Sequence, residues 1–410
     1  MTAHRGVQSG GRPLERELES GLRYSYDSVD QEIVCGVDAI STIGASLDRL
    51  GVSRPMVVCG PTILRESDVV QRVQRALGAR CVGLFSGVEP HPPLEVVYEA
   101  GDAASELHPD ALVSVGGGST HDTCKGMAIL LAGGRDLHDY EIRFEPPFKV
   151  FSPDLPPDRV PIICVPTTMG GAELGRSGGD VTDKALGRKF FLSGKGASPK
   201  AIIIDGKALA TTPTSILVST AIGQFRLAVE SVYSRRRNPI CDAFGLHAIE
   251  MLERYLPRCP EKDLDCLLKI KTAACLASLA GAVGQGLNTA TAHNVGALYQ
   301  VAHGEANAIL LPHTMRFNLD ASAGQQARVA KAMRIDTRGM SAEEAGLAAA
   351  DGFARLCREM EMPATLRQVG VPEEGLERIA AATLHNQALS TNPKPITGVG
   401  PIMKVLRDAW

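Results

Sequence analysis

Residues 113–125 read VSVGGGSTHDTCK and indicate an α/β fold. An apolar run typical of a buried strand leads into three consecutive glycines, and a segment with helical spacing follows them. Because glycine has no Cβ atom, such a turn lets backbone N–H groups approach an anion at the positive end of a helix. The spacing differs from the G-x-G-x-x-G fingerprint of many nucleotide-binding folds. A tight turn without any ligand therefore explains the three glycines equally well.

Segments of strand type and of helix type alternate around this turn. Other apolar runs are typical of buried strands: MVVCG (56–60), CVGLFSGV (81–88), PIICVPTT (161–168) and AIIID (201–205). Segments with helical spacing lie between the strands at 67–79, 93–108 and 120–134. This alternation predicts parallel strands joined by helices. Residues 175–192 are expected to form a hairpin-like excursion between the last two strands.

A second glycine segment, PTTMGGAE (166–173), also follows a buried strand. It offers hydroxyl groups together with glycines, as the first turn does with Ser119. Two such segments after neighbouring strands favour a bound dinucleotide over two bare turns.

The pattern changes after Asp205. Thr212 followed by Pro213 is a favourable helix start, and the rest of the chain shows helical periodicity with almost no strand pattern. We therefore predict an α/β dinucleotide-binding domain over residues 1–206 and an all-helical substrate domain over residues 207–410. Residues 1–20 are polar and glycine-rich, and a loose tail is expected there.

Composition excludes several classes of function. The 410 residues are 44% hydrophobic and 22% charged, which is ordinary for a globular protein of two or three domains. The formal net charge of -3 argues against nucleic acid or an anionic membrane as a partner. No apolar run approaches the ~20 residues that span a bilayer, and the N-terminus lacks the apolar core of a signal peptide. Ten cysteines without a C-x-x-C pair predict reduced thiols in a cytoplasmic protein.

Beyond these patterns, GGGSTHDTCK resembles the GGGSxxDxxK motif of the iron-containing (group III) alcohol dehydrogenases. Further similar blocks are SGVEPHPP (86–93), VTDKALGRKF (181–190), NPICDAFGLHAIE (238–250), HGEANAILLPHTMRFN (303–318) and TNPKP (391–395). The resemblance implies a dinucleotide domain, a helical domain, and a cleft between them that holds nicotinamide and a small-molecule substrate. A homodimer is also expected.

The resemblance also implies which residues bind the cofactor. The pyrophosphate would lie against the residues of the glycine turn, namely Gly116, Gly117, Gly118 and Ser119. Asp122 would lie nearby, Thr167 and Thr168 along the cofactor, and Lys189 near its ribose or nicotinamide end. Gly60 stands where the family often has an acid that binds the adenosine ribose. Because that carboxylate is missing, either NAD or NADP is expected.

The residues that hold the family's metal are mostly absent. The family uses an Asp and three His, and the first two lie four residues apart on one helix face. In AIGQFRLAVE (221–230), Gly223 stands at the Asp place and Leu227 at the first His place. Thr289 replaces the next His, so only His303 remains. One imidazole cannot hold a divalent ion against water, and we therefore predict a site without metal.

Maleylacetate reductases, in the same superfamily, also act without a metal. The segment PTTMGGAE is similar in length to theirs, but they keep a His where Thr289 stands here. HGEANAILLPH is closer to the alcohol dehydrogenases. The chain therefore departs from both branches, and the resemblance does not name the substrate.

Without a metal, other groups must neutralise the oxyanion that hydride transfer creates. By resemblance His293 and His303 face the cleft, and an imidazole that titrates near neutrality can donate a proton. Arg226 is expected either at the cleft rim, where it would bind a substrate carboxylate, or on the surface. The run Arg235–Arg237 is expected to be a solvated helix end.

Three functions remain open at this point. The first is a metal-independent, NAD(P)H-dependent oxidoreductase that reduces a small carbonyl or enone, with a carboxylated substrate as in maleylacetate reductases. The second is a non-redox enzyme, an isomerase or a carbon–carbon bond-forming enzyme, that keeps the nucleotide site. The third is a catalytically silent homologue, which the retained GGGS motif and the two histidines argue against.

Overall fold

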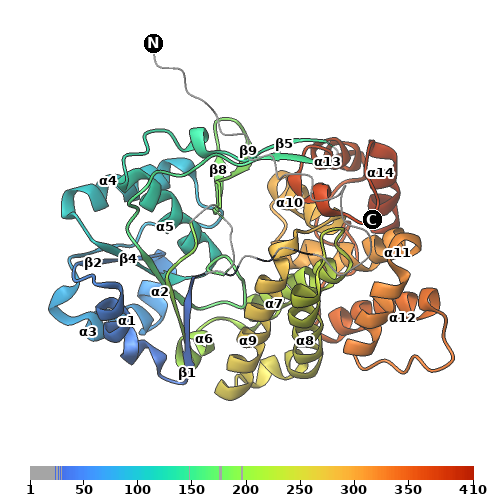
Figure 1. Ribbon diagram of the computed structural model, residues 1–410, viewed down its shortest axis with the longest axis horizontal. Helices are drawn as coiled ribbons and strands as arrows, with labels where there is room; N and C mark the ends of the chain where they lie inside the picture. Colours follow the sequence, from blue (N-terminus) through green and yellow to red (C-terminus); the bar gives the residue numbers. More distant parts are fainter. Residues whose placement is uncertain are drawn as a thin grey trace, which may run out of the picture.

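The computed structural model describes residues 24, 26, 28, 30–146, 148–174, 178–194 and 197–410. The tail predicted over residues 1–20 lies outside these ranges. Figure 1 shows an α/β half, coloured blue to green, beside a helical half, coloured yellow-green to red. This arrangement confirms the predicted fold class.

A single parallel sheet forms the centre of the α/β half. Its strand order is β1-β10-β7-β4-β2-β3. The strands are β1 (Glu32–Gly36), β2 (Pro55–Cys59), β3 (Gly83–Phe85), β4 (Ala111–Gly116), β7 (Ile162–Pro166) and β10 (Ala201–Asp205). Every residue of β2, β4, β7 and β10 is buried, which explains their continuous apolar sequences.

Helices cover both faces of the sheet. They are α1 (Ile43–Leu50), α2 (Pro61–Glu66), α3 (Val69–Leu77), α4 (Leu94–Leu107) and α5 (Gly118–Leu131). Apolar side chains of α1 and α3 pack on one face, while those of α4 and α5 pack on the other. The predicted segments of helix type are confirmed within a few residues of their bounds.

The register of β4 and β7 brings the two glycine segments together. The strands are parallel neighbours, and Gly116 at the end of β4 pairs with Pro166 at the end of β7. Both segments therefore leave the sheet at the same edge, where open α/β sheets bind ligands.

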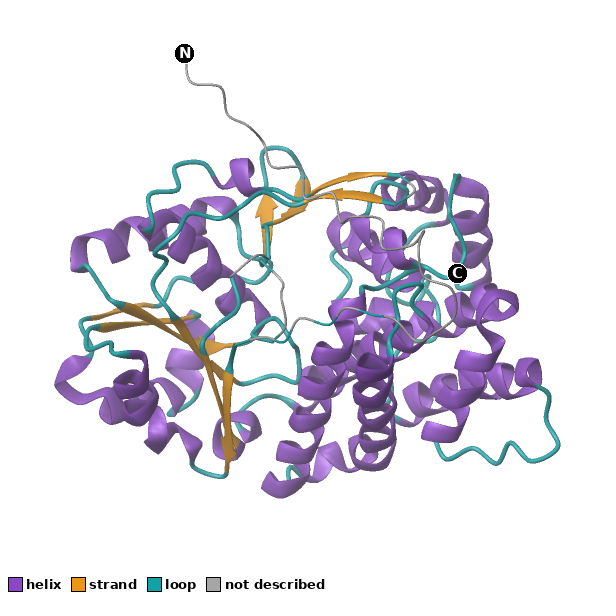
Figure 2. Ribbon diagram, in the orientation of Figure 1, coloured by secondary structure: helices purple, strands orange, loops and turns teal. Residues whose placement is uncertain are grey.

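Two hairpins lie outside the sheet. The expected excursion forms β8 (Asp180–Asp183) and β9 (Arg188–Phe191), although residues 175–177 are not described. A second hairpin, β5 (Arg143–Glu145) with β6 (Lys149–Phe151), was not predicted. It contacts the short helix η7 (Gln387–Thr391) of the helical half. Figure 2 shows these orange strands reaching from one half to the other.

The chain is helical from Gly206 onward, where the predicted domain boundary lies. The helices are α6 (Gly206–Ala210), α7 (Thr214–Tyr233), α8 (Pro239–Tyr255), α9 (Leu264–Ala280), α10 (Leu287–Tyr299), α11 (His303–Ala332), α12 (Ala342–Glu359), α13 (Leu376–Thr383) and α14 (Val399–Asp408). Residues 221–233 of α7 are all buried, so this helix is the centre of the domain. Asn238 and Asp263 cap α8 and α9 through their side chains.

The expectation that no apolar run approaches the length of a membrane span is wrong for one helix. Residues Leu264–Val283 are long and apolar enough to cross a bilayer by length and composition alone. The segment packs against α7 and α8 and is 61% buried over its most apolar window. Burial in the helical domain accounts for its apolar sequence.

Candidate active site

A cavity of about 600 Å³ lies between the two halves. Its wall comes from the glycine segments after β4 and β7, from α7, from the hairpin β8–β9 and from η7. A smaller cavity of about 180 Å³ adjoins it. Both are lined by Gly118, Asp122, Asp180, His293 and His303. Sequence-distant candidates for cofactor binding and for catalysis thus meet in one place.

The glycine turn after β4 requires glycine at position 116 and leaves little room for a side chain at position 117. Gly116 has a φ of +152°, and a Cβ there would lie 2.5 Å from Oγ1 of Thr120. A Cβ on Gly117 would lie 3.1 Å from the Thr168 side chain. No side chain caps α5 at Gly117, which leaves the first N–H groups of this helix for an anion. The turn therefore fits the pyrophosphate of a dinucleotide.

Lysines hold the two glycine segments in place. Lys125, the last residue of the GGGSTHDTCK motif, donates from Nζ to the carbonyl of Ala172 at 2.6 Å and to Asp122 at 3.2 Å. Lys271 from α9 donates to the carbonyl of Gly170 at 2.5 Å and forms a buried ion pair with Glu173. Both lysines are buried; Lys125 fixes the second segment against the first, and Lys271 fixes it against α9.

The remaining cofactor candidates are partly brought together. Ser119 accepts a hydrogen bond from the backbone N–H of His91 at 3.1 Å, and Lys189 Nζ lies 3.0 Å from Nδ1 of the same histidine. All three line the smaller cavity. Thr168 lines the larger one. Thr167 instead donates its backbone N–H to Gly116 and accepts from the Thr212 hydroxyl, and the two cavity walls do not include it.

Gly60 lies apart from both cavities. It is the residue before α2, and a Cβ there would lie 3.1 Å from the carbonyl oxygen of Val88. The position after β2 therefore presents backbone only, without a carboxylate of its own.

Two carboxyl groups line both cavities, and the sequence indicated only one of them. Burial raises the pKa of Asp122 against the opposing charge of Lys125. Burial also raises the pKa of Asp180 against the charges of Lys189 and Lys125. Asp180 directly precedes the block VTDKALGRKF, which is the signal that could have found it.

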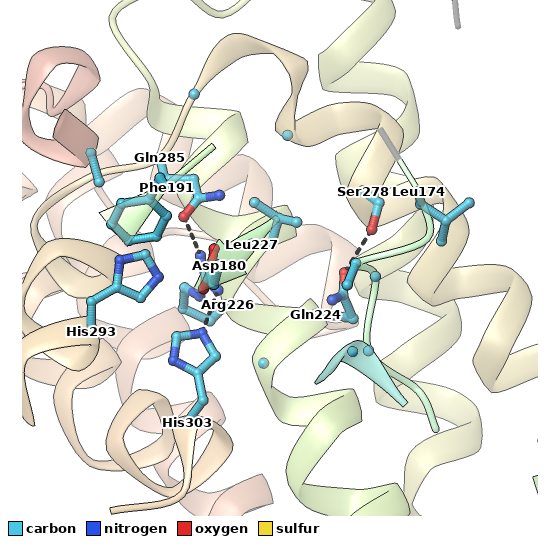
Figure 3. A pocket seen from close by; sticks show the side chains of 18 of the residues that line it. Leu174, Asp180, Phe191, Gln224, Arg226, Leu227, Ser278, Gln285, His293 and His303 are labelled. Carbon is cyan, nitrogen blue, oxygen red and sulfur yellow. Dashed lines mark hydrogen bonds between the residues drawn. The ribbon is translucent and has the colours of Figure 1, made fainter. Parts of the chain in front are cut away.

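Arg226 on α7 contacts two of the places where the family holds its metal. Nη1 donates to the Thr289 hydroxyl, and Nη2 lies 3.3 Å from Nε2 of His303. Gln285 and Glu230 also accept from Nη1, at 3.2 and 3.3 Å. Figure 3 shows Arg226 between Gln285 and His303, with a dashed line to each. With 4% exposure, Arg226 is neither on the surface nor at the rim, which corrects that expectation.

Glu230 joins the guanidinium to the start of α10. Its Oε1 accepts from the backbone N–H of Asn288 at 3.0 Å, and its Oε2 accepts from the Thr289 hydroxyl. A helix N-terminus has unsatisfied N–H groups and favours negative charge, so the carboxylate is stabilised there. Burial lowers the pKa of Arg226, and the charge of Glu230 opposes that shift. The result is a fixed buried cation with a counter-ion behind it.

These residues do not fit a divalent ion. Gly223 has no side chain, Leu227 is apolar, and the Thr289 hydroxyl is engaged with Glu230 and Arg226. Nε2 of His303 accepts from Arg226, whose positive charge would also repel a metal. Within the described residues, no group of three or more His, Cys, Asp or Glu could hold a metal ion.

The two candidate histidines are stacked. The ring centroids of His293 and His303 lie 5.3 Å apart at an interplanar angle of 27°, and Phe191 packs 5.1 Å from the first ring. Burial, with the charges of Lys189 and Arg226, lowers the pKa of His293 to about 3. Enclosure in the cleft also lowers the pKa of His303. The expectation that these imidazoles titrate near neutrality is therefore wrong, because the site desolvates them beside fixed cations.

The arginine run after α7 has three different environments. Arg235 stacks 3.9 Å from the centre of the Phe148 ring, and Arg237 pairs with Asp242 at 3.1 Å. Arg236 lines the larger cavity, and its side chain has no partner among the described residues. The prediction of a solvated helix end is therefore incomplete, since one of the three cations faces the site.

Comparisons with known proteins find relatives along almost the whole chain. The family model "Iron-containing alcohol dehydrogenase" matches residues 30–206, and "Fe-containing alcohol dehydrogenase family, C-terminal" matches residues 217–410. Lactaldehyde reductase of Escherichia coli (strain K12) is 30% identical over 378 residues, which cover 92% of this chain and 97% of that protein. Maleylacetate reductase of Burkholderia cepacia is 27% identical over 378 residues, or 91% and 94% of the two chains. The crystal structure of a 1,3-propanediol oxidoreductase is similar with a TM-score of 0.86 and 29% sequence identity. The match covers 95% of this chain and 100% of that chain.

Proposed function

Because the chain belongs to the iron-containing alcohol dehydrogenase family, we propose that it is a metal-independent reductase of a small carbonyl or enone that carries a carboxylate. Its membership of the family makes the chain an NAD(P)-dependent oxidoreductase, as the resemblance implied. The proposal goes further and concerns the group that stabilises charge on the substrate.

The observation that carries the proposal is the position of Arg226. Its guanidinium contacts Thr289 and His303, two residues at places where the family holds its metal. A cation that is fixed before the reaction stabilises an oxyanion without reorganisation, and burial strengthens that interaction. A guanidinium therefore supplies the positive charge that a metal ion would otherwise provide.

The residues around the two cavities would hold the cofactor and position it against the substrate. When bound, a reduced nicotinamide supplies the hydride. The glycine turn and the N-terminus of α5 would hold the pyrophosphate, with Lys189 and Ser119 beside it in the smaller cavity. His293 and His303 line both cavities, which supports a position for them where the nicotinamide end would meet the substrate.

Two features of the larger cavity support a carboxylated substrate. Nε of Arg226 is buried without a hydrogen-bond partner in the described part of the chain. Arg236 lines the same cavity and is exposed. The carboxylates in the cavity wall are Asp122 and Asp180, and both lie on the α/β side next to lysines. The helical side therefore offers a free Nε donor on Arg226 and the cation of Arg236, which suit an acid.

A substrate panel tests this function. The purified protein would be supplied with NADPH or NADH, and the nicotinamide absorbance would be followed with oxoacids, carboxylated enones and uncharged aldehydes of matched size. We expect the acids to be reduced with much higher kcat/KM than the uncharged compounds. Faster turnover of the uncharged aldehydes would refute the proposal that the substrate carries a carboxylate. Cofactor binding by calorimetry without oxidation by any compound would instead support the non-redox enzyme.

A further inference from the structure

We infer that the two stacked histidines are held in opposite tautomers, and that Nε2–H of His293 gives its proton to the substrate oxygen. Asn386 is the positioning residue for His293, and His303 is the positioning residue for Arg226. This assignment rests on the proposed reductase function and adds to it the identity of the proton donor.

The amide of Asn386 fixes the first tautomer. Its Oδ1 accepts from the backbone N–H of Ala388 at 3.0 Å, so its NH₂ group must point the other way. That NH₂ group lies 3.2 Å from Nδ1 of His293. An amide NH₂ can only donate, so Nδ1 accepts and the hydrogen of the neutral ring is on Nε2. Nε2 has no partner among the described residues, and His293 lines both cavities.

Arg226 fixes the second tautomer in the opposite sense. A guanidinium has five donors and no acceptor, so Nε2 of His303 must accept from Nη2 at 3.3 Å. The hydrogen of the neutral ring is then on Nδ1. A hydrogen on Nε2 would point a donor at a donor, and an imidazolium would in addition place two cations together. Nε2 of His303 therefore cannot donate a proton to the substrate, and it orients the guanidinium of Arg226 instead.

The charges around the pair keep both rings neutral. Lys189 from β9 and Arg226 from α7 face His293, and His303 from α11 stacks on it. Asp122 and Asp180 line the same cavities, but burial raises the pKa of each and each interacts with a lysine, so the cations dominate and the imidazolium form is disfavoured. The same positive charges stabilise the anionic form of the ring. His293 therefore acts as a neutral N–H donor, the state in which an imidazole polarises a carbonyl.

The proton transfer balances within the site. Once the carbonyl carbon has gained a hydride, its oxygen carries the electron pair of the former C=O π bond. That oxygen takes the proton from Nε2 of His293, and the N–H electron pair stays on the ring. Lys189 and Arg226 stabilise the resulting imidazolate, which then takes up one proton from the solvent. This is the proton that reduction of a carbonyl by NAD(P)H consumes overall.

Nitrogen NMR tests the tautomers without any substrate. In protein labelled with ¹⁵N-histidine, a ring nitrogen that carries hydrogen and a bare ring nitrogen have widely separated shifts. His293→Gln and His303→Gln would assign the two sets of signals. We expect His293 to carry hydrogen on Nε2 and His303 on Nδ1. The same tautomer on both rings would overturn the assignment, whether or not a substrate has been found.

Asn386→Asp tests the role of the donor. The substitution keeps the volume and the bond from Ala388 N–H, but its carboxylate accepts hydrogen from Nδ1 of His293. The tautomer reverses and the pKa of His293 rises. We expect the turnover of the unaltered protein to be independent of pH between about pH 6 and 9. The turnover of the variant should fall about 10²-fold at the alkaline end, and it should recover in acid, where protonation returns a hydrogen to Nε2.

The control is Asn238→Asp, which makes the same change at the cap of α8, away from the histidines. Its pH profile should stay flat. A flat profile with full turnover in Asn386→Asp would overturn His293 as the donor. Absence of reduction by the unaltered protein would instead overturn the proposed function, and NMR would still decide the tautomers.

Discussion

Replacement of Arg226 by methionine removes the buried cation and keeps most of the length of the side chain. Breaking one side of a buried ion pair costs about 3–5 kcal/mol of stability, because the remaining charge is left uncompensated. Here Glu230 keeps the N–H of Asn288 and the hydroxyl of Thr289, so we expect about 3 kcal/mol. Loss of one oxyanion donor lowers kcat by about 10²–10³-fold.

The double variant Arg226→Met with Glu230→Gln separates these effects. A neutral amide at position 230 still accepts from Asn288 and needs no cation, so stability should return to within about 1 kcal/mol of the unaltered protein. Turnover should stay low. Urea unfolding measures the stability, and kcat for the reduction of an acid substrate measures the turnover. Recovery of turnover together with stability would refute the electrostatic role of Arg226, and so would full turnover in the single variant.

Three other changes have defined outcomes. Arg236→Gln should raise KM for acid substrates about tenfold with kcat unchanged, whereas Arg237→Gln, which breaks a pair outside the cavity, should not. Gly60→Asp should weaken NADPH binding about tenfold in calorimetry and leave NADH binding unchanged, because a carboxylate repels the 2′-phosphate. An equal loss of affinity for NADPH and NADH would contradict this prediction. His293 has a pKa of about 3 in the folded state against 6.5 unfolded, so the unfolded chain takes up its proton first as pH falls. The free energy of unfolding should fall below pH 6.5, and His293→Gln should lessen that slope in urea titrations.

Much of the α/β half could be predicted because its central strands are buried on both faces. Such strands have continuous apolar sequences, as in PMVVC and AIIID. β1 was missed because it is an edge strand with alternating burial in EIVCG. The hairpin β5–β6 was missed because its strands are mostly exposed and its contacts are with η7, more than two hundred residues away in the chain.

The site could be predicted only where a residue lies in a local motif. The glycine turn, Ser119 and Asp122 belong to one short segment. The role of Arg226 depends on partners at positions 285, 289 and 303, which meet only in the folded chain. Asn386 lies in no recognised pattern, and its effect depends on which of its atoms faces His293.

The measurement that most directly tests the central claim is metal content and turnover on the same chelator-treated sample. The sample would be assayed before and after addition of iron(II) or zinc, with Arg226→Met measured in parallel. We expect full turnover with far less than one metal ion per chain, no gain on adding metal, and loss of turnover in the variant. Turnover that rises in proportion to bound iron or zinc would contradict the account.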